Sequence, residues 1–139
     1  MRHEYKAALL GGIPLAVSMF CVLLMVSPGR ELELVFLLLS GGIGALFAYL
    51  CYKSSPTGFS LKKATRVGAS VGVTAGGLYF ASAALLHLIA ANSEVVLSAH
   101  SISLAVIGVV QLAVASGLGG LSVGLMSKWI HARTEIRED

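Results

Sequence analysis

Charged residues are scarce in this sequence. Asp, Glu, Lys and Arg make up 12% of the 139 residues, about half of the ~25% share that is typical of soluble domains. Four long stretches contain none of them: residues 7–29, 34–52, 67–93 and 95–127. Each is close to or above the length of about 20 apolar residues that a helix needs to cross the ~30 Å hydrocarbon core of a bilayer.

These stretches predict an all-α, polytopic integral membrane protein that forms one domain over residues 1–139. A soluble helical bundle needs helices with one polar face, whereas these stretches are apolar around most of their circumference. The first stretch is longer than the apolar region of a signal peptide and no small-x-small cleavage site follows it, so we expect it to be retained. The expected transmembrane helices cover about residues 7–27, 34–52, 67–91 and 102–127.

The expected spans contain no Asp, Glu, Lys or Arg, and this absence argues against several functions. Asp, Glu, Lys and Arg inside a membrane usually mark proton relays and ion coupling, so a proton-coupled or sodium-coupled pump is disfavoured. The sequence also lacks a Ser-His-Asp set, a carboxylate pair, a CxxC motif and a phosphate-binding loop. The two cysteines, Cys21 and Cys51, lie in different spans at different depths, which argues against a disulfide bond and a metal site. We therefore expect neither enzymatic activity nor a cofactor.

Lys and Arg are distributed asymmetrically among the segments that flank the spans. Nine of the ten basic residues fall in the N-terminal tail, the second loop and the C-terminal tail, and Arg30 alone falls in the first loop. Basic segments stay on the cytoplasmic side, so we expect a cell (inner or plasma) membrane protein with both termini in the cytoplasm. The net charge of +3 suits contact with anionic lipid and, without a nucleic-acid-binding motif, predicts no nucleic-acid partner.

Glycine is abundant, and much of it recurs at a spacing of four residues. Such residues share one helix face, and small residues let helices approach closely in lipid, where apolar burial alone does not favour a helix neighbour. We expect three grooved helices that pack tightly in the bundle, with at least one groove as a candidate contact for a second subunit. The chain is thus expected to form a homo-oligomer or part of a larger membrane complex. The predicted packing residues are Gly44, Ala48, Gly68, Gly72, Gly76, Gly120 and Gly124.

Short motifs recur in the two halves of the chain. Lys6-Ala7 followed by Gly11 resembles Lys63-Ala64 followed by Gly68, and Ser40-Gly41-x-x-Gly44 resembles Ser116-Gly117-x-x-Gly120. The sequence is compatible with two tandem helical hairpins related by an axis along the membrane normal. Ser60 is expected to cap a helix that begins at Leu61. Residues 94–101 either form a short interfacial helix or lengthen the fourth helix.

A few polar side chains fall within the expected spans. Gln111, Tyr79 and Ser82 are candidates for a polar intramembrane cluster; a buried amide usually ties helices together, and a permeation or ligand site is the alternative. His87 and His100 lie near the outer bend and lack an obvious acid–base partner. The most favoured role is a non-enzymatic subunit or scaffold of a membrane assembly. The alternatives are a passive channel or transporter formed by an oligomer and, less favoured, a membrane enzyme that uses one of these histidines.

Overall fold

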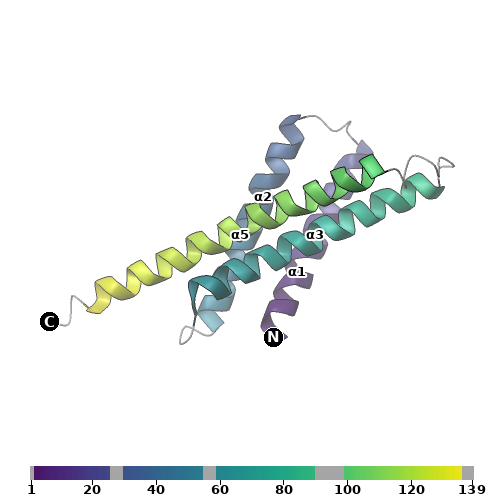
Figure 1. Ribbon diagram of the computed structural model, residues 1–139. Coiled ribbons are helices and arrows are strands. Elements are labelled where there is room, and N and C mark those ends of the chain that lie inside the picture. Colours follow the sequence, from purple (N-terminus) through teal and green to yellow (C-terminus); the bar gives the residue numbers. More distant parts are fainter. Residues whose placement is uncertain (1, 26–29, 55–58, 90–98, 136–139) are drawn as a thin grey trace.

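The computed structural model describes residues 2–25, 30–54, 59–89 and 99–135, and their regular structure is entirely helical (Figure 1). The all-α prediction is therefore confirmed for this part of the chain. The helices are α1 (Arg2–Met25), α2 (Arg30–Ser54), α3 (Leu61–Ile89) and α5 (Ala99–Glu135).

Three of these helices are long and apolar enough to cross a membrane. The qualifying segments are Glu31–Ser54 in α2, Leu61–Leu86 in α3 and Ile102–Ile130 in α5. The apolar part of α1, Ala8–Val22, is shorter. The chain thus has the helices of a membrane protein, and three of the four expected spans are matched in length and composition.

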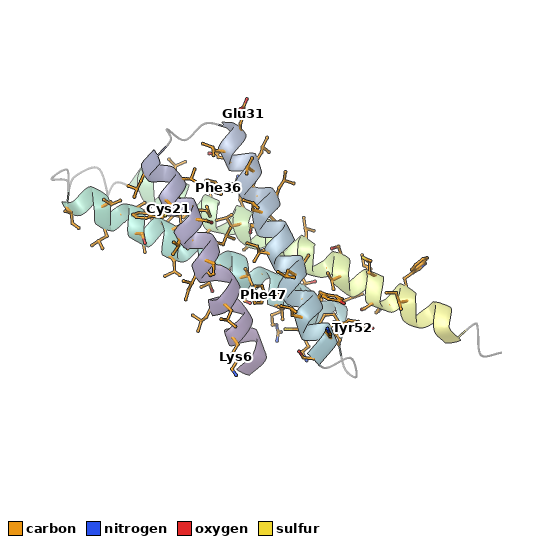
Figure 2. All side chains as sticks on the ribbon, turned by 180° about the vertical axis from the view of Figure 1, so that it is seen from behind. Lys6, Cys21, Glu31, Phe36, Phe47 and Tyr52 are labelled. Carbon is orange, nitrogen blue, oxygen red and sulfur yellow. The ribbon has the colours of Figure 1, made fainter. Side chains whose placement is uncertain are left out.

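The helices form two crossed layers. Helices α3 and α5 run side by side in one layer, and α1 and α2 lie across the same face of that pair (Figures 1 and 2). The interface between α3 and α5 is the most extensive, and α3 also contacts both α1 and α2. Helices α1 and α2 touch each other only slightly. The two sequential hairpins therefore pack differently, and the suggested duplication remains a prediction.

The apolar core lies between the two layers and is small. Its buried members are Leu15 and Met19 of α1, Ala75 of α3 and Leu112 of α5. Many large apolar side chains point outward: Leu38, for example, is 77% exposed. A surface of this kind is suited to contact with lipid acyl chains rather than water.

The start of α3 follows from local sequence. The Ser60 hydroxyl accepts a hydrogen bond from the Lys63 backbone N–H at 3.2 Å, and the Ser60 carbonyl accepts one from the Ala64 N–H at 2.9 Å. Ser60 thus satisfies a backbone donor that a helix N-terminus leaves without a partner, which confirms the predicted cap. The predicted segment of residues 94–101 lies mostly outside the described residues. Helix α5 begins at Ala99.

Candidate functional site

The glycine row of α3 lies directly against α5. A Cβ atom added to Gly68 would lie 3.2 Å from the Gly120 Cα, and one added to Gly72 would lie 2.6 Å from the Leu112 carbonyl carbon. A Cβ at Gly76 would lie 3.1 Å from the Val109 Cα. These neighbours are backbone atoms, so the two helices approach as closely as their main chains allow.

The reciprocal row on α5 faces α3 in the same way. A Cβ added to Gly120 would lie 3.1 Å from the Ala64 carbonyl carbon, and one added to Gly124 would lie 3.4 Å from the Leu61 Cα. We refer to this contact between the rows of α3 and α5 as the glycine seam. Close backbone approach of this kind adds dispersion and weak Cα–H···O contacts that lipid chains do not supply.

Helix α2 joins α5 next to the glycine seam. A Cβ added to Gly44 would lie 2.8 Å from the Ser116 Cα, and Ala48 is completely buried. The Ser40 hydroxyl donates a hydrogen bond to the Leu112 carbonyl at 3.2 Å. All seven predicted packing residues therefore lie between helices of the same chain.

Two neighbouring glycines on α5 serve two different helices. A Cβ on Gly119 would lie 2.8 Å from the carbonyl carbon of Gly41 in α2, whereas Gly120 faces α3. By contrast, a Cβ on Gly42 or Gly77 would meet no atom within 4 Å. Gly119 and Gly120 of α5 therefore contact other helices of the same chain, whereas Gly42 and Gly77 face outward.

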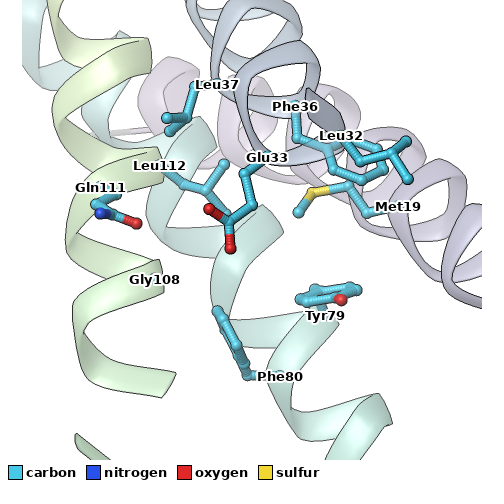
Figure 3. Close-up of a pocket in the computed structure, with 10 residues that line it drawn as sticks. All are labelled: Met19, Leu32, Glu33, Phe36, Leu37, Tyr79, Phe80, Gly108, Gln111 and Leu112. Atoms are coloured by element: carbon cyan, nitrogen blue, oxygen red, sulfur yellow. The ribbon is translucent and has the colours of Figure 1, made fainter. Parts of the chain in front are cut away.

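Two of the three predicted polar residues meet at a cavity of about 180 Å³ (Figure 3). Tyr79 of α3 and Gln111 of α5 line it, together with Glu33 of α2. We refer to this space as the acidic cavity. Its other lining residues are Met19, Leu32, Phe36, Leu37, Phe80, Gly108 and Leu112.

Ser82 does not belong to the acidic cavity. It lines a second cavity of about 310 Å³ with Leu78 and residues of α1, including Ile13 and Val17. Three residues advance a helix by about 300°, so Ser82 lies about 60° around α3 from Tyr79. That rotation places the two side chains against different faces of α1, and the predicted set of three residues is divided between two sites.

Glu33 is the member of the acidic cavity that the sequence did not indicate. It was expected in the loop before the second span, whereas α2 already begins at Arg30 and places Glu33 within its first turn. Its carboxylate points into the space that Gln111, Tyr79 and Phe80 border (Figure 3). The three polar side chains, Glu33, Tyr79 and Gln111, form no hydrogen bond or ion pair with any other residue that the structure describes.

Aromatic rings form one wall of the acidic cavity. The Tyr79 and Phe80 rings pack edge to face, with centroids 5.0 Å apart and planes at 76°. The Phe80 ring rests on Gly108, where an added Cβ would lie 2.6 Å from the ring atom Cε2. The glycine thus leaves room for the ring to lie beside α5.

The described residues include no group of three or more His, Cys, Asp or Glu side chains that could hold a metal ion. His87 and His100 lie in α3 and α5, but their side chains are outside the described part of the structure. The chemistry of the acidic cavity therefore rests on one carboxylate, one amide, one phenol and the neighbouring aromatic rings.

Comparison of the chain with protein-family models, curated proteins and solved structures finds no match.

Proposed function

We propose that this chain is a non-enzymatic subunit or scaffold of a cell-membrane assembly, with four spans and both termini in the cytoplasm. The observation that carries the proposal is an apolar surface with an outward-facing small-residue row on α3. Exposed Gly77 and Ala81 lie four residues apart in this row, between exposed Val73 and Leu85. We refer to these four residues as the outer row.

The fourth span in this proposal is α1. Its 24 residues extend about 36 Å at ~1.5 Å per residue, although its apolar part is shorter. A short apolar segment is accommodated by local thinning of the bilayer and by extension of flanking basic side chains to the interface. Lys6 at the start of α1 is exposed and suits this role.

Charge and position together support the proposed orientation. Lys6 and Tyr52 lie at one end of the bundle, and Cys21 and Glu31 lie at the other (Figure 2). The Lys6 end is the one from which the basic second loop extends, since Lys53 is in the last turn of α2. Basic segments favour the cytoplasmic side, so we assign that end to the cytoplasm.

The outer row is the surface on which we expect a second helix to dock. Small residues four positions apart allow the backbone of a partner to approach closely, as in other small-xxx-small contacts in membranes. A Cβ at Gly77 would meet no atom of the chain within 4 Å, so the notch remains open after the bundle has packed. The partner in this proposal is a second copy of the chain or another membrane subunit.

Replacement of Gly77 by Ile tests the proposal. We expect wild-type protein in mild detergent to have a native mass above the 14.4 kDa of one chain and the Gly77→Ile variant to lose the associated species. The matched control is Gly42→Ile, which fills the open glycine of α2 and leaves the outer row intact. A strictly monomeric wild-type chain that co-purifies with no partner contradicts the proposal.

The alternative function is a passive pore formed by an oligomer. Gln111 and Tyr79 line the same cavity, whereas Ser82 lines another. A pore in this alternative would therefore be lined by Gln111 and Tyr79 without Ser82. Solute flux into liposomes that carry wild-type or Gln111→Leu protein distinguishes the two functions. Flux that the substitution abolishes supports the pore, whereas absence of flux for the tested solutes leaves the subunit role in place.

A further inference from the structure

The acidic cavity combines one negative charge with aromatic surfaces. Glu33 supplies the charge, and Phe36, Tyr79 and Phe80 supply the rings among its lining residues. The carboxylate is exposed and has no partner among the described residues, so it is available to a cation that enters the cavity. A cation that enters the cavity would meet this carboxylate and the ring faces together.

The chemistry of the lining selects the kind of cation. A metal ion needs several oxygen or nitrogen ligands, and the lining contains one carboxylate, one amide oxygen and one phenol. Aromatic faces attract ammonium groups through the ring quadrupole, and this attraction is the basis of quaternary ammonium recognition by aromatic cages. The Tyr79 and Phe80 rings, whose planes lie at 76°, together border one corner of the cavity.

Cavity size and location indicate how such a ligand would be held. Pockets for whole drug-sized ligands have volumes of about 300–1,000 Å³, and the acidic cavity has a volume of about 180 Å³. It is partly open and is bordered by the apolar Leu32 and Leu37. An ammonium head group fits the space, and an attached hydrocarbon chain would leave it along the apolar surface of the bundle.

We infer that the acidic cavity binds the ammonium head group of an amphiphile, with Glu33 as counter-ion and the Tyr79–Phe80 corner as the aromatic contact. The head group belongs either to a zwitterionic lipid or to a free single-chain quaternary ammonium compound. This inference goes beyond the proposed subunit role, because it requires only a folded protomer and no association.

The experiment measures ligand binding by native mass spectrometry in a neutral maltoside detergent. The probes are decyltrimethylammonium, phosphatidylcholine, and phosphatidylglycerol with the same acyl chains. We expect at least one of the first two to bind saturably and more tightly than phosphatidylglycerol. Binding of phosphatidylcholine alone identifies a lipid head group as the ligand, and binding of decyltrimethylammonium alone identifies a free single-chain quaternary ammonium compound.

Two glutamates on the same helix provide a matched pair of variants. Glu33→Gln keeps the shape of the side chain and removes its charge. Because Glu33 is exposed, we expect ammonium binding to weaken about two- to fivefold, the range of an exposed ion pair. Glu31→Gln removes the same charge two residues away, outside the cavity lining, and we expect a change below about twofold from this weaker, screened interaction. Size-exclusion profiles of both variants report whether the fold is intact.

A second variant tests the aromatic contact without a change in charge. Phe80→Leu removes a ring and retains apolar volume, so we expect binding of the ammonium probe to weaken about two- to fivefold. Equal losses in Glu31→Gln and Glu33→Gln, or equal binding of phosphatidylcholine and phosphatidylglycerol without binding of decyltrimethylammonium, overturn the inference. Glu33→Gln protein should keep the native mass of the wild type, so a failure here is distinguishable from a failure of the subunit proposal.

Discussion

The glycines of the seam on α3 and Gly11 of α1 are both buried in helix contacts, but they meet different atoms. In the glycine seam, Gly72 lies against the backbone of Leu112, with a hypothetical Cβ 2.6 Å from its carbonyl carbon. In α1, a Cβ on Gly11 would lie 2.8 Å from atoms of the Phe47 ring. One contact joins two backbones and the other receives the end of a side chain.

This difference has a mechanical consequence. A backbone in a packed helix moves only with the rest of its helix, whereas a ring at the end of a side chain can rotate away from an added methyl group. The seam between α3 and α5 should therefore tolerate less change at Gly72 than the contact of α1 tolerates at Gly11. Glycines in helix contacts can thus face either a backbone or a side chain, and the two kinds of contact differ in how well they tolerate an added methyl group.

The largest effect is expected from Gly72→Ala. The added methyl group would overlap the Leu112 backbone and the Ser116 hydroxyl, and overpacking that the surroundings cannot relieve costs about 3 kcal/mol or more. The measurement is the free energy of unfolding in mixed micelles, followed by circular dichroism. The matched control is Gly77→Ala, where the new methyl group meets open space; a similar loss in both variants contradicts the comparison.

A smaller effect is expected from Gly11→Ala. The Phe47 ring is only partly buried and can shift to admit the methyl group, although Val71 Cγ1 lies at 3.2 Å from the added atom. We expect a loss of about 1 kcal/mol in the same unfolding measurement, at the low end of the range for overpacking. A loss as large as that of Gly72→Ala would show that the two kinds of contact are equally rigid.

The features of the fold that depend on local sequence were predictable. The uncharged stretches locate α2, α3 and α5, and Ser60 marks the start of α3, because span length and helix capping are properties of adjacent residues. For α1 the described apolar segment, Ala8–Val22, is shorter than the expected span of residues 7–27, and residues 26–27 lie outside the described residues. Spacing of four placed the glycines on common faces, but it does not specify which helix each face meets.

The candidate site was less predictable, because it depends on how the helices cross. Glu33 directly precedes the apolar run of α2 and follows two other charged residues, Arg30 and Glu31. Such a cluster of charges is typical of a loop. Only the beginning of α2 at Arg30 and its crossing near Tyr79 and Gln111 bring the carboxylate to the cavity. The helical phase of α3, which separates Ser82 from Tyr79, was the one available signal that the predicted polar cluster would divide.

The smallest effect is expected from removal of a hydroxyl at the edge of the glycine seam. Ser40 is completely buried and donates a hydrogen bond from α2 to the Leu112 carbonyl of α5. Ser40→Ala should cost about 0.6 kcal/mol of unfolding free energy, the average for an interhelical hydrogen bond in a membrane protein. The Ser116 hydroxyl donates to the same carbonyl at 2.8 Å, so the acceptor keeps a side-chain partner in the variant.

Ser122→Ala is the control for that prediction. The Ser122 hydroxyl is exposed and donates at 2.7 Å to Gly119 of its own helix, so its loss should leave the stability of the bundle unchanged. If Ser40→Ala and Ser122→Ala behave alike, α2 is held on α5 by close packing at Gly41 and Gly44 without a contribution from the Ser40 hydrogen bond. If Ser40→Ala costs as much as Gly72→Ala, the hydrogen bond of Ser40 and the close backbone packing at Gly72 stabilise the bundle equally. That result contradicts the larger contribution that we assign to the glycine seam.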